Sequence, residues 1–188
     1  KQGFTYVFDR VTGEPVWPIE ERPVAAGDVP GEWYSPTQPF PTKPPPFEYQ
    51  GISIDDLVDF TPEIRALAVE AVQNFRLGGL FTPPMLSVDG GLQGTIQRPW
   101  IGGGASWSGA AVDPETGLLY VPSENSFSVL KYYTPDSAEG GNLRFTQADF
   151  GSGTQPTMPQ GLPLLKPPYS RMTAIDLNAG EHAWMRPN

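Results

Sequence analysis

The residue types that most often perform chemistry are scarce in this sequence. It contains no cysteine, which excludes thiolate chemistry, and one histidine, His182, which excludes metal sites built from several imidazoles. We expect His182 to be a solvated turn residue, because it follows a glycine turn. The carboxylates that recur at a fixed spacing are Asp9, Asp113 and Asp176, each four residues before a glycine. An aspartate at such a position caps a turn, so we assign none of the three as a catalytic base or metal ligand.

These aspartates mark three copies of one pattern, at residues 6–17, 110–121 and 173–184. In each copy an apolar strand ends at the aspartate, a glycine closes the turn with a positive φ angle, and a second strand follows. A large apolar residue stands four positions after each glycine: Trp17, Val121 and Trp184. We predict three tight hairpins, with Trp17 and Trp184 buried against neighbouring strands. Hairpins that cannot bury both faces alone must stack, which favours successive propeller blades, about three in all. The alternative is three unrelated hairpins that share a common turn.

The first two copies lie farther apart than a blade of roughly 40–50 residues requires. Residues 18–100 are therefore interpreted as an insertion or an irregular blade. Its proline-rich stretch, residues 30–46, should run extended over a surface, because prolines lack amide donors. A helix is predicted over residues 61–76, with Thr61 as N-cap, Pro62 as first residue and apolar residues at helical spacing. A shorter helix can begin at Ser53, with Asp56 completing a capping box. We expect both helices to cover the propeller rather than to carry chemistry.

The composition indicates a folded, loop-rich β protein. Glycine (21) and proline (23) are abundant, yet 12% of the residues are aromatic, and disordered chains are poor in aromatic residues. The net charge of -9 argues against a nucleic-acid partner, since no basic stripe is present to neutralise phosphates. No apolar run approaches the roughly 18 residues of a membrane-spanning helix. We interpret residues 1–188 as one partial domain. Because the sequence starts at Lys1 rather than methionine, we expect it to be processed or cut from a longer protein.

Five blocks of the sequence resemble one known family. They are KQGFTYVFDRVTGEPVWP at 1–18, SPTQPF at 35–40, GLFTPP at 79–84, GGGASWSGAAVD at 102–113 and YSRMTAIDL at 169–177. In this order they are similar to the PQQ-dependent (quinoprotein) glucose dehydrogenases of the membrane-associated type, of which the chain would be an internal or C-terminal fragment. The resemblance implies an all-β fold: a partial β-propeller, with several four-stranded antiparallel blades of an eight-bladed quinoprotein propeller and a proline-rich, helical insertion.

The resemblance also implies two cofactor-binding residues. Lys1 corresponds to a lysine that contacts the quinone of pyrroloquinoline quinone (PQQ), where an ammonium group can stabilise developing negative charge. Trp107 follows a glycine run that lets the backbone approach a flat ligand, and its indole can lie near the cofactor plane. The alternatives are a solvated lysine and a core tryptophan. Family members often have asparagine before this tryptophan; Ser106 replaces it here and removes an amide donor. The catalytic base and the ligands of a divalent cation (Ca or Mg) are expected upstream of Lys1, so no catalytic or metal residue is assigned in this chain.

The function implied is oxidation of a sugar, polyol or alcohol by hydride transfer to the quinone, with electrons passed to a membrane quinone or other acceptor. The location implied is the periplasm or the periplasmic side of a membrane. The competing hypothesis is a non-catalytic β-propeller scaffold that binds protein partners, which would need neither Lys1 nor the block around Trp107. By itself the chain should be inactive, and it should associate with the remaining propeller blades or with itself, because an open arc leaves apolar blade faces uncovered.

Overall fold

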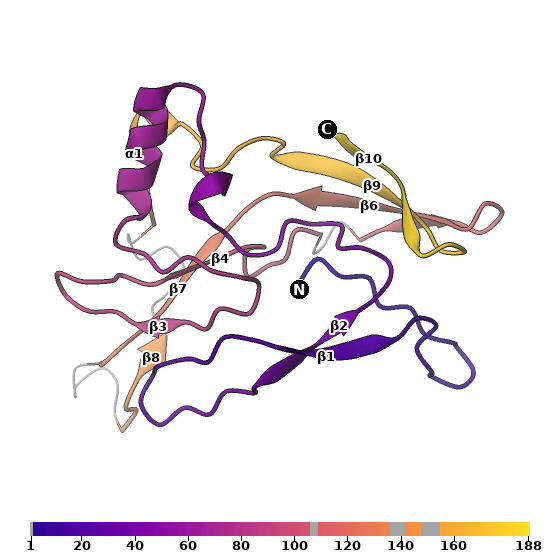
Figure 1. The fold of residues 1–188 in the computed structure, drawn as a ribbon, viewed down its shortest axis with the longest axis horizontal. Coiled ribbons are helices and arrows are strands. Elements are labelled where there is room, and N and C mark those ends of the chain that lie inside the picture. Colours follow the sequence, from indigo (N-terminus) through magenta and orange to yellow (C-terminus); the bar gives the residue numbers. More distant parts are fainter. Residues whose placement is uncertain (1, 106–108, 136–141, 148–154) are drawn as a thin grey trace.

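The computed structural model describes residues 2–105, 109–135, 142–147 and 155–188. The described chain is mostly β, as predicted, with one α-helix and strands arranged in three sheets (Figure 1). The strands are β1 (Ile19–Pro23), β2 (Thr37–Pro41), β3 (Met85–Leu86), β4 (Thr95–Gln97), β5 (Ala111–Asp113), β6 (Leu118–Glu124), β7 (Ser128–Tyr133), β8 (Thr146–Gln147), β9 (Ser170–Asp176) and β10 (Glu181–Pro187). The helices are α1 (Pro62–Val72) and the short 3₁₀ turns η1 (Ile54–Asp56) and η2 (Pro159–Gly161). Within the described ranges, no helix combines the length and apolarity needed to cross a bilayer.

The largest regular unit is a four-stranded antiparallel sheet in the order β10-β9-β6-β5. It has the up-and-down strand order of a propeller blade, interrupted between β6 and β9 by β7, β8 and η2. The second and third copies of the repeated hairpin are the two outer pairs of this one sheet, because β6 pairs with β9 from Leu118↔Asp176 to Glu124↔Ser170. The prediction that the copies lie in successive blades is therefore wrong for the second and third copies, which share one sheet. Two adjacent hairpins of a single blade can share the same turn chemistry.

The three predicted turns are confirmed. Asp9 accepts hydrogen bonds from the amides of Val11 (2.9 Å) and Thr12 (2.8 Å), and Gly13, Gly117 and Gly180 all have positive φ angles near +70°. The pKa of Asp9 is lowered mainly by the Thr12 amide and also by the Val11 amide. The three carboxylates therefore accept hydrogen bonds from amides of their own turns.

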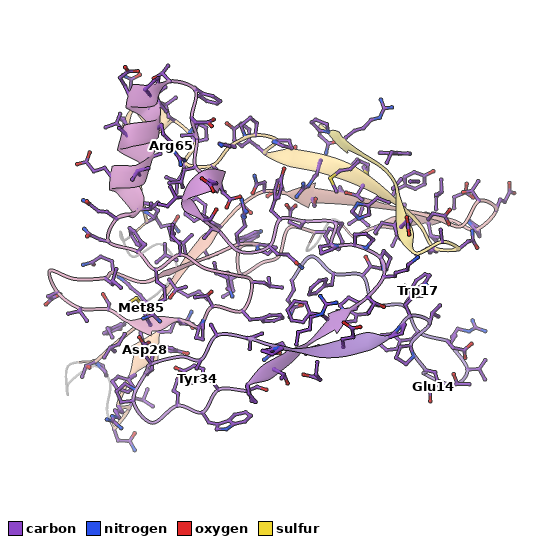
Figure 2. The ribbon with its side chains drawn as sticks, viewed as in Figure 1. Glu14, Trp17, Asp28, Tyr34, Arg65 and Met85 are labelled. Carbon is purple, nitrogen blue, oxygen red and sulfur yellow. The ribbon has the colours of Figure 1, made fainter. Side chains whose placement is uncertain are left out.

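The prediction for the two repeat tryptophans is correct only in part. Trp17 is half-buried, and its ring lies over Gly180 in the turn between β9 and β10 (Figure 2). Trp184 is 38% exposed, so its predicted burial is wrong. It lies on β10, the edge strand of the sheet, where it contacts the ring of Tyr120.

The proline-rich stretch forms a strand rather than only a surface run. Strand β2 pairs with β1, with Thr42 N bonded to Pro18 O (2.9 Å) and Val24 N to Pro36 O (3.0 Å). Hydrogen-bonded pairs alternate with non-bonded pairs along an antiparallel ladder. Pro39 and Pro41 fall on the non-bonded pairs, so their missing amides remove no ladder bond.

Helix α1 belongs to the largest apolar core of the described chain. Its N-cap is as predicted, since Thr61 Oγ1 accepts from Ile64 N (3.2 Å), but the helix ends at Val72, before the predicted residue 76. The Ser53–Asp56 capping box is also present, and Arg65 reaches from α1 to the Ile54 and Leu57 carbonyls (Figure 2). The buried core comprises Ile52, Leu57, Val58, Ala68, Val72, Ile96, Met158, Leu164 and Leu165. The helical insertion and the segment before β9 therefore fold as one unit.

Candidate functional site

Both residues that the sequence assigns to a cofactor, Lys1 and Trp107, lie outside the described residues, as does Ser106. Their described neighbours can be placed. On the amino-terminal side, Gly3 O accepts from Phe47 N (2.9 Å) and Gln2 O accepts from Gln50 Nε2 (2.8 Å). On the other side, Gly104 O accepts from Glu124 N at the end of β6 (2.9 Å).

The two neighbouring segments meet at one side chain, that of Glu48. A Cβ atom on Gly3 would lie 2.8 Å from Glu48 Cβ, and one on Gly104 would lie 2.8 Å from Glu48 Cγ and 2.9 Å from its Oε2. Both distances are too short for a side chain, and Gly3 also has a φ angle of +78°. Glycine is therefore required at both positions for the two segments to approach Glu48.

Glu48 is held by a buried ion pair. Its side chain is fully buried and contacts the guanidinium of Arg171, which lies on β9 with 5% of its side chain exposed. Arg171 also lies 3.9 Å from the centre of the Tyr49 ring, and Arg98 lies 4.9 Å from it. An arginine next to an aromatic ring gains cation–π attraction, which is strongest where water is excluded. The Tyr49 ring thus contacts both buried guanidinium groups, those of Arg98 and Arg171.

Arg98 completes a second ion pair, with Asp56 of η1. The two groups are 2.7 Å apart, and Arg98 Nε also donates to Gly51 O (2.6 Å). Burial alone would raise the pKa of Asp56, but hydrogen bonds from Arg98 and Ser53 outweigh it, and the pKa is lowered. This second pair fixes the loop before the insertion helix to the segment that leads into the glycine run.

Several buried polar atoms around Glu48 have no hydrogen-bond partner among the described residues. They include Glu48 Oε2, Arg171 Nε, Ser123 Oγ and Thr173 Oγ1. Ser123 lies opposite Arg171, and Val121 opposite Thr173, so these side chains share one face of the blade sheet. A buried polar atom without a partner is costly. These atoms are enclosed by protein, so they belong to the packing around Glu48 rather than to an open surface.

Three hollows share Phe81 in their lining, and one of them adjoins the amino-terminal segment. One, with a volume of about 160 Å³, is lined by Gln2, Leu80, Phe81, Gln97, Pro99, Trp100 and Ile101. Two others, of about 390 and 240 Å³, also include Phe81 and are lined by parts of the 35–40 and 79–84 blocks. Ligand pockets usually occupy about 300–1,000 Å³. The smallest hollow, beside Gln2, is thus below the size that encloses a whole ligand.

Glu48 and Arg171 were not identified from the sequence. Arg171 stands in the 169–177 block, but neither its pairing nor Glu48 has a local signature. His182 was expected to be solvated, and this is wrong: it is half-buried, and its Nε2 lies 3.0 Å from Pro45 O. The proline-rich segment covers the β10 hairpin and supplies that carbonyl. Across the described ranges, no three His, Asp or Glu side chains gather as a potential metal site.

The described chain is mostly β, and its four-stranded up-and-down sheet is the type of unit from which β-propellers are built. The chain belongs to the PQQ family of glucose, ethanol and alcohol dehydrogenase β-propeller domains, whose model matches residues 1–188. This confirms the resemblance and the partial propeller.

The relatives are dehydrogenases. The chain is 30% identical to quinate/shikimate dehydrogenase (quinone) of Acinetobacter baylyi, with 100% of the chain and 24% of the relative aligned. It is 29% identical to the glycerol dehydrogenase large subunit of Gluconobacter thailandicus, over 100% of the chain and 28% of the relative. It is 29% identical to quinoprotein glucose dehydrogenase of Escherichia coli, over 99% of the chain and 24% of the relative. The chain thus spans about a quarter of the length of these relatives. No solved structure matches it.

Proposed function

We propose that the whole protein is a PQQ-dependent dehydrogenase and that this chain supplies part of its cofactor site. The observation that supports the proposal is the meeting of the Gly3 and Gly104 segments at Glu48. Two stretches of sequence that resemble cofactor-binding blocks are far apart in the chain, and their described neighbours lie against the same side chain. A scaffold that binds only proteins would not need this arrangement.

The residues of this chain fit a flat, polyanionic cofactor. Glycine at positions 3 and 104 lets the backbone of both segments approach closely. Lys1 would bind the cofactor through its ammonium group, by pairing with a carboxylate or donating to a quinone oxygen. Trp107 would provide an apolar surface that excludes water from one side of the cofactor. PQQ, when bound, supplies an ortho-quinone that accepts a hydride equivalent from the substrate.

The substrate class follows from the relatives' names. Quinate, shikimate, glycerol and glucose are all polyhydroxylated compounds. We therefore propose that the substrate is a sugar, polyol or related alcohol. The electron acceptor would be a membrane quinone or another acceptor, and the protein would act in the periplasm or on the periplasmic side of a membrane. The base and the divalent cation (Ca or Mg) would be held by residues outside this chain.

The test uses the full-length protein with PQQ, Ca²⁺ or Mg²⁺, a polyol or sugar, and an artificial electron acceptor. Acceptor reduction should depend on both PQQ and the cation. Lys1→Ala should lower kcat by about 100-fold or more, the magnitude expected when a preorganised charge is lost. Lys166→Ala is the control: Lys166 forms an ion pair with Asp59 and is partly exposed, so its loss should change the rate less than twofold. An unchanged rate for Lys1→Ala at saturating PQQ would remove Lys1 from the site. Failure of the wild-type protein to bind PQQ would favour the scaffold hypothesis.

A further inference from the structure

We propose that Glu48 is a positioning residue: its buried carboxylate, fixed by Arg171, sets the separation of the Gly3 and Gly104 segments and thereby the affinity for PQQ. The inference rests on the proposed function, because it assigns a task within the same cofactor site. Glu48 would not touch the cofactor. It would act through the two segments that lead to the proposed contacts.

The first step of the argument is mechanical. Loop 47–50 belongs to no helix or strand, whereas Arg171 lies on β9, which is paired on both sides, with β6 and β10. The Glu48–Arg171 ion pair therefore anchors a loop to the most firmly held strand of the blade. The same loop holds the amino-terminal segment through the Phe47 amide and the Gln50 side chain. A displacement of Glu48 would move the amino-terminal segment with it.

The second step concerns the other side of Glu48. Its Oε2 is buried without a partner in the described chain and faces Gly104, where an added methyl group would meet it at 2.9 Å. The glycine segment also cannot retreat freely, since the Gly104 carbonyl is bonded to the Glu124 amide and Glu124 O would lie 3.0 Å from the added Cβ. The carboxylate is thus a spacer between two segments, each bonded in place. Close contacts of this kind transmit small shifts, because interiors are packed at crystal density.

The third step explains why a carboxylate is needed. Glutamine has nearly the same size but either directs an amide NH₂ toward the guanidinium or turns it toward Gly104. In the first arrangement a donor opposes a donor, and in the second the amide oxygen stays on Arg171 but the ion pair becomes a weaker hydrogen bond to a neutral group. Glu48→Gln should therefore loosen the spacing without creating a cavity. Supporting residues of this type hold binding groups to within about 0.5 Å, and small misplacements reduce affinity.

The experiment measures PQQ binding by the full-length protein in Ca²⁺ buffer, by absorbance or fluorescence titration, beside the melting temperature without PQQ. Glu48→Gln should raise the Kd for PQQ by roughly tenfold, and at saturating PQQ it should lower kcat less than Lys1→Ala does, because it shifts the Lys1 segment without removing the ammonium group. The matched control is Asp28→Asn, which breaks the Arg76–Asp28 ion pair, away from both glycine segments. It should lower the melting temperature slightly and leave the Kd unchanged. A Glu48→Gln protein that melts earlier but binds PQQ like wild type would reduce Glu48 to a structural role and overturn the proposal.

A second variant keeps the test decisive if Glu48→Gln does not fold. Gly104→Ala leaves both charges in place and pushes directly on Glu48, so it should also raise the Kd for PQQ. Gly91→Ala is its control, because a methyl group there meets no atom closer than 3.4 Å. A folded Gly104→Ala protein with unchanged PQQ affinity would contradict the proposal. If the wild-type protein binds no PQQ, the proposed function fails first and the proposal falls with it. If wild type binds PQQ and neither variant alters the Kd, only the role of Glu48 fails.

Discussion

The two faces of the blade sheet differ in burial and in residue type. The buried face carries the polar residues Ser123, Arg171 and Thr173 beside the apolar Val121 and Ile175, whereas the face with Tyr120 and Trp184 is aromatic and partly exposed. Sheets with one solvated side normally bury apolar residues and expose polar ones. The difference indicates two tasks: the polar face receives the Glu48 loop, and the aromatic face is suited to contact with another apolar surface.

The largest expected effect breaks the polar face. Arg171→Met should leave the Glu48 carboxylate buried without its partner, which typically costs about 3–5 kcal/mol of unfolding free energy. Replacing both members, Glu48→Met with Arg171→Met, should recover most of that loss, because an apolar pair needs no desolvation of charge. Urea unfolding of the chain and its two variants measures both changes. A double variant as unstable as the single one would show that the ion pair itself stabilises the face.

A smaller loss is expected from the apolar part of the same face. Ile175 is fully buried on β9, and Ile175→Ala should cost about 2–5 kcal/mol through lost burial and a residual cavity. The comparison on the other face, Trp184→Ala, should cost less for each Å² of side chain removed, because 38% of Trp184 is already exposed. Equal losses per Å² removed, measured by urea unfolding, would contradict the difference between the faces.

The sequence predicted the parts of this molecule that depend on local chemistry. The turns at Asp9, Asp113 and Asp176 and the caps at Ser53 and Thr61 each involve residues only a few positions apart. Their hydrogen bonds are determined by nearby residue types, so pattern reasoning could find them.

Long-range contacts were beyond such reasoning. Glu48 and Arg171 are 123 positions apart, and nothing near either residue specifies the other. The predicted burial of Trp184 was wrong for a related reason. The pattern placed a bulky residue four positions after the turn glycine, but the burial of that residue depends on what covers the edge of the sheet. The assignment of Lys1 and Trp107 came from the resemblance, and both stay predictions.

The aromatic face gives the next prediction, on association. The isolated chain should form species larger than a monomer, because Tyr120 and Trp184 offer an uncovered apolar surface. Trp184→Ser should shift it toward the monomer in light scattering, whereas Ser123→Ala on the buried face should not. The isolated chain should also retain little PQQ after gel filtration. A monomer that keeps stoichiometric PQQ would mean that the chain holds the cofactor without further blades.

The smallest expected effect concerns acid and the second ion pair beside Tyr49. The folded-state pKa of Asp56 is lowered, because hydrogen bonds from Arg98 and Ser53 outweigh the opposing effect of burial. A lowered folded-state pKa means that the carboxylate stabilises the fold above its unfolded pKa of about 3.9, and that this contribution is lost as the pH falls through the folded value. The stability difference between wild type and Asp56→Asn should therefore be constant from about pH 7 to pH 5 and shrink below about pH 4. Urea midpoints at several pH values measure it, with the exposed Asp89→Asn variant as control. A difference that stays constant down to pH 3 would show that Asp56 contributes through its shape and hydrogen bonds rather than through its charge.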